Sequence, residues 1–215
     1  MKIELKKYDE QIVEWPKSGY HIMAQHDEEE IIVYQSYRKE IGEFAAKNQY
    51  FGGAFSLDRM TWIKPNFLWM MYRNGWGTKE GQETVLAIHL KISAFNKYLQ
   101  NAVYSSYSSS LEMSHEEWQT QVKTSSVRLQ WDPDHDPYGN KLERRAIQIG
   151  LRDDFIKSFA KEDIVLIEDI SEFVKEQYEF VQNKQLEKLM IPAEKPFLFK
   201  DEELNKKLKI SGNHG

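Results

Sequence analysis

The sequence predicts an α+β fold in a single domain, with mixed or antiparallel sheets and flanking helices. Stretches of period-2 apolar alternation are interleaved with stretches of helical spacing, the order expected of strands and helices that share one core. No internal repeat interrupts this order, and 215 residues with 40% apolar content are enough for one sizeable core. We therefore predict one domain over residues 1–200 and a charged, frayed C-terminal tail over residues 201–215.

The first half of the chain contains two predicted pairs of a strand followed by a helix. In the first pair, β-branched residues indicate a buried strand, and the helix carries Ile41, Phe44 and Ala45 at helical spacing. In the second pair, alternating side chains indicate a strand, and Ser93 can cap the helix that follows. The predicted bounds are 30–37 and 38–48 for the first pair, and 83–92 and 94–103 for the second.

Between these pairs lies the segment RMTWIKPNFLWMMYRNGWG, residues 59–77, which is rich in Trp and Met. Pro65 suits the first turn of a helix and Gly75 suits its end, so we predict a helix over residues 65–75. Both faces of this helix are apolar or aromatic. We therefore expect it to be buried almost all round.

The second half of the chain contains further helices and strands. Ser114 and Glu117 form a capping box, which predicts a short helix after the low-complexity loop 104–110. Ser171 begins a long polar helix that Pro192 stops. Three strands are predicted in this half, at 126–131, 144–152 and 164–170.

An acidic segment joins the first two of these strands. Six of its oxygen-bearing side chains match the ligand positions of a calcium loop, but Pro137 stands where that geometry requires Gly. The flanking segments are also strands rather than helices, so we predict a rigid hairpin connection and no bound metal. The six residues are Asp132, Asp134, Asp136, Tyr138, Asn140 and Glu143.

Composition excludes several classes of protein. The net charge is −5, so a nucleic-acid partner would have to be held by a local basic cleft. The absence of Cys excludes disulfides and thiolate chemistry. No apolar run has the length of a signal peptide or of a membrane span, and we expect a soluble, cytoplasmic protein without a membrane partner. Common zinc-protease, serine-hydrolase and P-loop motifs are absent, and we expect His89 to be packed or hydrogen-bonded.

The residues just before the 65–75 helix form the first candidate site. Arg59, Thr61, Trp62 and Lys64 lie where an extended segment enters the helix N-terminus, and helix N-termini attract anions such as phosphate. Two cations and a hydroxyl at this place suit a pyrophosphate. The alternative is surface charge beside a core helix, and the residues leave both interpretations open.

The predicted strand 144–152 forms the second candidate site. Its apolar side chains lie on one face, and Gln148 lies on the other face between Ala146 and Gly150. A polar side chain between two very small ones leaves space above the sheet, as in the floor of a ligand site. The alternative is an ordinary half-exposed strand with Gln148 in water.

These segments carry a resemblance to a known family. The run RMTWIKPNFLWMMYRNGW, with VYQSYR before it and VRLQWDPDHDP and RRAIQIGLR after it, resembles the domain of unknown function 4291 over residues 8–200. The stretch YFGGAFSLDRMTWIKPNFLWMMY is more distantly similar in layout to DarT-type ADP-ribosyltransferase toxins. In that superfamily a first-strand motif and an Arg segment hold NAD, and a Glu or Gln on a later strand lies beside the bond that breaks.

The resemblance implies a site for NAD as substrate. Residues Tyr34 to Arg38 would match the first-strand motif, Arg59 and Thr61 the second motif, and Gln148 the third. The toxins resemble one another in having a catalytic Glu at the third position. Gln148 departs from that pattern, because an amide cannot act as a base.

We thus arrive at a hypothesis of an ADP-ribosyltransferase-like domain that transfers ADP-ribose to an unknown acceptor, for which the toxins suggest nucleic acid. Arg59, helped by Arg38 or Lys64, would hold the pyrophosphate, and Gln148 would orient the ribose. Trp62 or Tyr72 would stack on a base. Asp132 and Glu143 are the candidates to activate the acceptor.

The alternative hypothesis is a non-catalytic nucleotide- or RNA-binding module. Three tryptophans would act as stacking platforms beside three arginines. These residues are Trp62, Trp76 and Trp131 with Arg59, Arg73 and Arg128. The sequence predicts neither the oligomeric state nor the physiological pathway.

Overall fold

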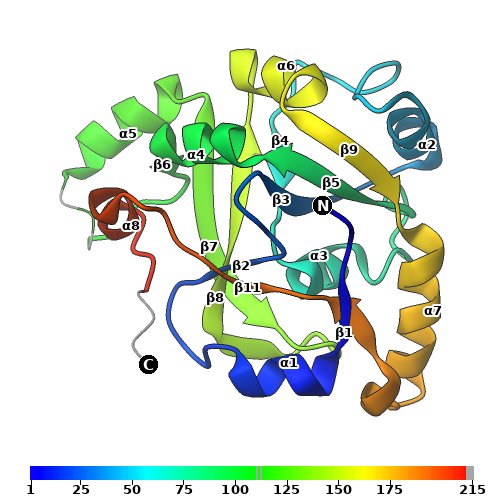
Figure 1. The fold of residues 1–215 in the computed structure, drawn as a ribbon. Helices are drawn as coiled ribbons and strands as arrows, with labels where there is room; N and C mark the ends of the chain where they lie inside the picture. Colours follow the sequence, from blue (N-terminus) through cyan, green and yellow to red (C-terminus); the bar gives the residue numbers. More distant parts are fainter. Residues whose placement is uncertain (110, 112, 212–215) are drawn as a thin grey trace.

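The computed structural model describes residues 1–109, 111 and 113–211, and it confirms the predicted α+β class with mixed and antiparallel sheets and flanking helices (Figure 1). The helices are α1 Tyr8–Glu14, α2 Lys39–Asn48, α3 Phe67–Asn74, α4 Ile92–Gln100, α5 His115–Thr124, α6 Asp153–Lys161, α7 Ser171–Gln182 and α8 Glu202–Lys207, with a 3-10 turn at Leu186–Lys188. The strands are β1 Leu5–Lys7, β2 Ile22–Ala24, β3 Glu30–Tyr37, β4 Thr61–Ile63, β5 Thr84–Lys91, β6 Ala102–Tyr104, β7 Val127–His135, β8 Lys141–Leu151, β9 Ile164–Asp169, β10 Met190–Pro192 and β11 Lys195–Phe197.

Two main sheets form the centre of the molecule. One is antiparallel with the order β3-β5-β9, and the other has the order β4-β8-β7-β6, in which β6 runs parallel to β7. The pairs β1-β10 and β2-β11 form small additional sheets. The two main sheets meet at β3 and β4, where Tyr34 and Lys64 exchange backbone hydrogen bonds of 2.7 and 3.2 Å.

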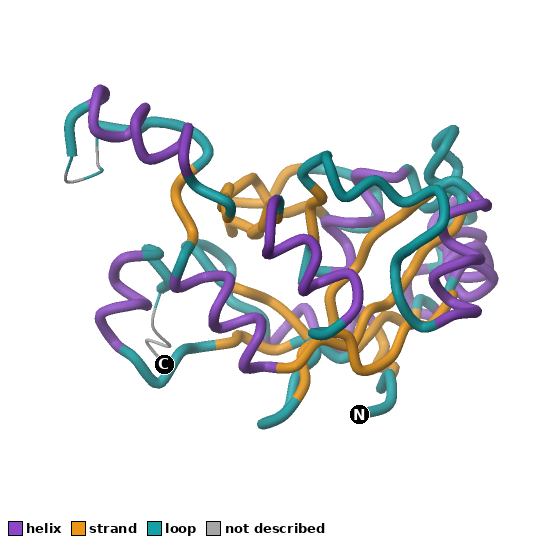
Figure 2. The backbone as a smooth tube through the Cα atoms, turned by 90° about the horizontal axis from the view of Figure 1, so that it is seen from above, coloured by secondary structure: helices purple, strands orange, loops and turns teal. Residues whose placement is uncertain are grey.

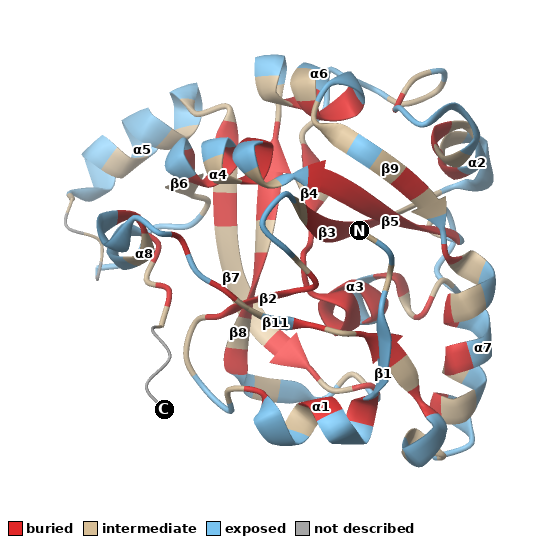
Figure 3. Cartoon of the chain, in the orientation of Figure 1, coloured by how far each residue is buried: buried red, intermediate tan, exposed pale blue. Residues whose placement is uncertain are grey.

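Two clusters of buried apolar side chains pack against these sheets. The buried residues are red in Figure 3. The first cluster lies on one face of each main sheet and includes side chains of α4 and α6. The second lies on the opposite face of the three-stranded sheet and includes side chains of α3 and α7. One face of the four-stranded sheet therefore belongs to the first core. Its other face carries the half-exposed residues Gln130, Asp132 and Gln148, and it is the face that matters for the site.

Several predicted elements are confirmed with close bounds. The predicted strand 30–37 is β3, and the predicted capping box at the start of α5 is present, with Glu117 N donating to Ser114 Oγ. The acidic segment forms a hairpin, as predicted, although its ends belong to β7 and β8 and the connection itself is residues 136–140. His89 is fully buried and hydrogen-bonds to Glu30 and Glu168, as expected for a packed histidine.

Helix α3 is shorter than predicted but as buried as its composition indicates. It begins after Asn66, whose side chain accepts a hydrogen bond from Trp69 N at 2.7 Å, and ends at Gly75, which has φ of 58°. Pro65 precedes the cap instead of occupying the first turn. Most of its side chains are buried, and Tyr72 and Arg73 are exposed.

Two predicted helices differ from the structure because tertiary pairing overrides local signals. The helix predicted over 94–103 begins at Ile92 without a Ser93 cap, and the chain after it pairs with β7 as strand β6. Helix α7 ends at Gln182, well before Pro192, and the left-handed Lys184 turns the chain so that β10 pairs with β1. In both places a strand partner distant in sequence satisfies backbone groups that a longer helix would have paired locally.

The segment predicted as a frayed tail is ordered as far as it is described. Helix α8 lies within it, and Leu204, Leu208 and Ile210 are buried in the first core. Residues 212–215 of the predicted tail lie outside the described residues. By contrast, α5 has no buried residue and stands away from the body of the molecule (Figure 2). No described helix is long and apolar enough to cross a membrane.

Candidate functional site

Two adjoining hollows lie where the main sheets meet. The first, which we call the Lys64 hollow, has a volume of about 230 Å³ and is lined by side chains of β3, β4 and α3, including Gln35, Lys64 and Arg73. The second, the Arg59 hollow, has a volume of about 320 Å³ and is lined by Arg38, Arg59 and the loop before β4. The two hollows share Tyr37, Met60 and Thr61 as a common wall.

The charge of these hollows is of one sign. Arg38, Arg59, Lys64 and Arg73 line them, and none of the described lining residues is Asp or Glu. Arg38 pairs with Glu40 at 3.2 Å, but both side chains are exposed, and such a pair competes weakly with a ligand. In a chain of net charge −5, four cations around adjoining hollows form a local site for an anion.

Lys64 is the most unusual of the four cations because it is buried. Its residue is 7% exposed, and Nζ donates a hydrogen bond to the Trp62 carbonyl at 3.4 Å. No described Asp or Glu lies within ion-pair distance of it. Burial, reinforced by the nearby charge of Arg73 and opposed by Asp132, lowers the pKa of Lys64 to about 7.

Thr61 is held in a hydrogen-bond network with two side chains of β3. Gln35 donates from Nε2 to Thr61 Oγ1 at 2.6 Å and to the Trp62 carbonyl at 3.2 Å, and the Tyr37 hydroxyl contacts Thr61 Oγ1 at 2.9 Å. The Gln35 carbonyl oxygen is buried without a partner among the described residues. Because Trp62 O can only accept, the Gln35 amide orientation is defined, and its oxygen is left as a free acceptor at the hollow.

Gln148 lies on the polar face of the four-stranded sheet, beside Lys64. The register of β4 and β8 pairs Ile63 with Ile149, so Lys64 and Gln148 are each one residue from this last pair. Gln148 donates from Nε2 to Asp132 at 2.8 Å, and Gln130 donates to the other oxygen of the same carboxylate at 2.8 Å. The predicted residues Lys64, Gln148 and Asp132 are thus brought together.

The space predicted above Gly150 is filled. A Cβ at Gly150 would lie 2.6 Å from Met60 Sδ and 3.1 Å from the Trp62 ring. Trp62 and Met60 therefore cover this end of the strand, and the glycine is needed for their close approach. Gln148, two residues before Gly150, is half exposed.

The predicted phosphate cradle at the N-terminus of α3 is occupied by the protein itself. Glu194 accepts hydrogen bonds from Phe67 N at 2.6 Å and from Asn66 Nδ2 at 2.9 Å, and burial raises the pKa of this carboxyl. Glu194 therefore accepts the hydrogen bond of a backbone N–H at the helix N-terminus, where a phosphate would otherwise bind. The cations of the site therefore attract anions without help from this helix terminus.

Three of the predicted site residues lie elsewhere. Tyr34 is fully buried in the second core, where its ring packs edge-on against Phe67 at 5.4 Å. Tyr72 stacks on His135 with ring centroids 3.5 Å apart, outside both hollows. Glu143 is exposed and lines a separate hollow near α1.

The three tryptophans of the alternative hypothesis do not share a surface. Trp62 lies on the polar face of the four-stranded sheet, whereas Trp131 packs against the first core and donates its N–H to the Leu208 carbonyl at 3.1 Å. Trp76 is buried and stacks on Tyr178, with ring centroids 5.7 Å apart. Packing thus occupies two of the three proposed platforms.

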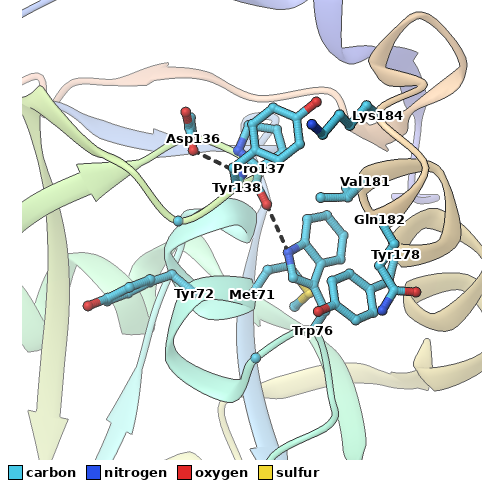
Figure 4. Close-up of a pocket in the computed structure, with 12 residues that line it drawn as sticks. Met71, Tyr72, Trp76, Asp136, Pro137, Tyr138, Tyr178, Val181, Gln182 and Lys184 are labelled. Atoms are coloured by element: carbon cyan, nitrogen blue, oxygen red, sulfur yellow. Dashed lines mark hydrogen bonds between the residues drawn. The ribbon is translucent and has the colours of Figure 1, made fainter.

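A third hollow of about 380 Å³, which we call the aromatic hollow, lies against α3, α7 and the β7–β8 connection (Figure 4). Figure 4 shows Trp76 donating its N–H to the Pro137 carbonyl, at 3.2 Å, with Tyr138 and Tyr178 nearby. Its lining includes both Asp136 and Lys184. The aromatic hollow therefore lacks the single-sign charge of the other two.

The acidic connection does not gather its carboxylates into a metal site. Asp134 forms a buried ion pair with Arg144, and Asp136 accepts hydrogen bonds from the backbone of Tyr138 and Asn140. No group of three or more potential ligands is found among the described residues. These carboxylates serve the hairpin and hold Arg144, which contacts Trp15 and Pro16 just after α1.

Two residues that shape the site, Gln35 and Glu194, differ in the signal that they carried in the sequence. Gln35 interrupts an otherwise apolar strand, and that interruption indicates a polar contact. Glu194 carried no local signal, because it reaches Asn66 across 128 residues of sequence.

Fold and site together define an α+β protein with a cation-lined cleft between two sheets. The chain belongs to the family described as Domain of unknown function (DUF4291), whose model matches residues 21–197. This confirms the first resemblance found in the sequence. No curated protein matches the chain.

Proposed function

We propose that this protein binds NAD in the cleft formed by the Lys64 and Arg59 hollows and transfers its ADP-ribose group to an acceptor. One observation carries the proposal: four cations and no described carboxylate line two adjoining hollows in an otherwise acidic chain. A dinucleotide has a doubly charged pyrophosphate between two halves, which suits two hollows with a shared wall. The similarity in layout to DarT-type toxins supports the choice of NAD among dinucleotides.

In this proposal the Arg59 hollow takes the pyrophosphate. Arg59 and Arg38 are exposed at its rim, where their guanidinium groups are able to bind phosphate oxygens in a bidentate manner. The nicotinamide riboside then enters the Lys64 hollow, beside Trp62. Gln148 would be near that end of the cleft, because Asp132, which accepts its hydrogen bond, is also close enough to Lys64 to affect the pKa of that lysine.

Gln148 would position the sugar and would not serve as a base. Its amide nitrogen is held by Asp132, so its carbonyl oxygen is available to accept a hydrogen bond from a ribose hydroxyl. An oriented sugar and preorganised dipoles favour the cationic ribose that forms as nicotinamide leaves. Nucleic acid is the first acceptor class to test, following the same similarity.

The test is a calorimetric titration and a thermal melt of the folded protein with NAD. We expect saturable binding at one site and a rise in melting temperature with NAD concentration, because a ligand of the native state stabilises it. Incubation with NAD and single-stranded oligonucleotides, read by mass spectrometry, should then detect free nicotinamide and a product heavier by one ADP-ribose group.

The same samples distinguish the alternative. A nucleotide- or RNA-binding module should bind oligonucleotides with a steep dependence on salt and leave NAD unbound. Binding of oligonucleotide without any effect of NAD would overturn the proposal.

A further inference from the structure

We infer that Lys64 is the general base of this cleft: its uncharged amine accepts the proton of the acceptor nucleophile while Gln148 holds the sugar. The inference rests on the proposed function, and it assigns the proton-accepting role that Gln148 cannot fill. It also differs from the role of phosphate ligand that the sequence suggested for this lysine.

The position of Lys64 relative to Gln148 is the first support. Lys64 directly follows β4, whose last residue Ile63 pairs with Ile149, the neighbour of Gln148. Asp132, which accepts a hydrogen bond from Gln148, is close enough to Lys64 to affect its pKa. An amine at this place can therefore reach a nucleophile that attacks a sugar bound to Gln148.

The surroundings of Lys64 are the second support. Its amine is buried at the wall of a hollow, with a 3.4 Å contact to a backbone carbonyl and no described carboxylate at ion-pair distance. The charged groups facing it are Arg73 from α3 and Asp132 from β7, and the Tyr37 hydroxyl of β3 lines the same hollow. Desolvation beside another cation is the arrangement that activates lysine amines. A pKa of about 7 leaves a large uncharged fraction at neutral pH.

The other candidate bases are less suited. Asp132 already accepts hydrogen bonds from Gln130 and Gln148, one on each carboxylate oxygen, so both oxygens are engaged within the protein. Glu143 is five residues from Gln148 along β8, about 16 Å at strand spacing, and lines another hollow.

The step is balanced with NAD and the acceptor alone. The bond between the nicotinamide nitrogen and ribose C1′ breaks, and its electron pair leaves with neutral nicotinamide. A lone pair of the acceptor oxygen or nitrogen forms the new bond to C1′. The acceptor proton passes to Lys64 Nζ, which becomes an ammonium and later releases the proton to solvent.

The first experiment measures the amine directly, without NAD turnover. Competitive labelling with acetic anhydride between pH 5 and pH 10, read by peptide mass spectrometry, gives a titration curve for each lysine. We expect Lys64 to become reactive about three pH units below an ordinary lysine, which titrates at about 10.4. The exposed Lys47 of α2 is the internal reference. A Lys64 that titrates with Lys47, or that is unreactive at every pH, overturns the inference.

Adding NAD separates this inference from the proposed function. Protection of Lys64, but not of Lys47, supports both. A Lys64 that reacts at low pH and is not protected by NAD shows that the cleft is not the NAD site, which overturns the proposed function and the inference resting on it. Protection combined with ordinary titration of Lys64 overturns the inference alone.

Two variants then test the catalytic role. Lys64→Arg keeps the cation but is not a base near pH 7, and Lys64→Met keeps the length without charge. For folded variants we expect NAD binding within a few-fold of wild type and a loss of turnover of about 100-fold or more, with loss of the pH inflection near neutrality. Wild-type turnover and an unchanged pH profile in either folded variant would contradict the assignment.

Discussion

At the scale of single residues, the burial of Lys64 should lower the free energy of unfolding by a measurable amount. Its amine is buried with no described carboxylate at ion-pair distance, and its pKa is lowered from the ordinary 10.5 to about 7. Between these two values the unfolded chain binds more protons than the native protein. The free energy of unfolding should therefore rise as the pH increases through this window. At pH values below about 7, the buried ammonium should destabilise the native protein to its full extent.

Lys64→Met removes the ionisable group and should remove this pH dependence. Below pH 7 we expect the variant to be more stable than the wild type by about 2–4 kcal/mol, because it no longer buries an unpaired charge. Urea unfolding of both proteins at pH 6 and pH 9 measures the difference, which should shrink at the higher pH. If the variant and the wild type have the same free energy of unfolding at both pH values, the burial of Lys64 does not destabilise the protein.

In contrast to Lys64, Arg59 is expected to affect ligand binding and not stability, since it is exposed at the rim of its hollow. Replacing it with Ala should leave the melting temperature nearly unchanged, because exposed charges contribute little to stability. NAD binding should weaken by about 2 kcal/mol or more through loss of a charge-assisted contact with phosphate. Calorimetric titration measures this, with Lys47→Ala as a control for loss of a surface cation outside both hollows. Equal NAD affinity in the two variants would remove Arg59 from the site.

At the scale of elements, α3 is a packing helix and the strand before it is one wall of the cleft. Met71 is fully buried and Trp69 is 4% exposed, whereas Trp62 is only half buried. Trp69→Ala and Met71→Ala should each lower the free energy of unfolding by about 2–5 kcal/mol, since each leaves a cavity. Trp62→Ala should cost less stability and should weaken ligand binding by about 1–3 kcal/mol through loss of a stacking surface.

Thermal melts and NAD titrations of the three variants decide between these roles. Met71→Leu, which preserves apolar volume, is the matched control and should cost little. If Trp62→Ala unfolds as readily as Trp69→Ala and has no separate effect on ligand, Trp62 is part of the core and the wall of the site lies elsewhere.

At the scale of the whole molecule, the C-terminal segment closes the first core. Leu208 is fully buried there, and its carbonyl accepts the Trp131 N–H, while Ser211 exchanges hydrogen bonds with Tyr20. Leu208→Ala should therefore lower the free energy of unfolding by about 2–5 kcal/mol. Leu198→Ala, at a leucine 38% exposed, should cost much less. Denaturant unfolding compares them, and equal small effects would mean that the segment adds little to the core.

The candidate site was predictable where its signals were local. Arg38, Arg59, Thr61 and Lys64 were expected at a ligand site, and they line the two hollows together. Tyr34 could not be placed correctly from sequence, because alternation along β3 does not specify which face meets the cleft. In the structure both faces of β3 are covered, and Tyr34 belongs to the core formed with α3 and α7.

The sequence by itself determined the long strands β3, β5, β7, β8 and β9, the helices α2, α3, α4, α5 and α7 in outline, and the burial of α3, because hydrophobic periodicity and capping act within a few residues. Tertiary structure alone decided which polar groups remain free. Glu194 closes the N-terminus of α3 from 128 residues away, so that terminus is unavailable to phosphate. The pairing of β3, β4 and β8 buries Lys64 beside Gln148, and the loss of hydration there lowers its pKa. The hydration of a side chain and its hydrogen-bond or ion-pair partners depend on contacts across the whole chain, which no local pattern encodes.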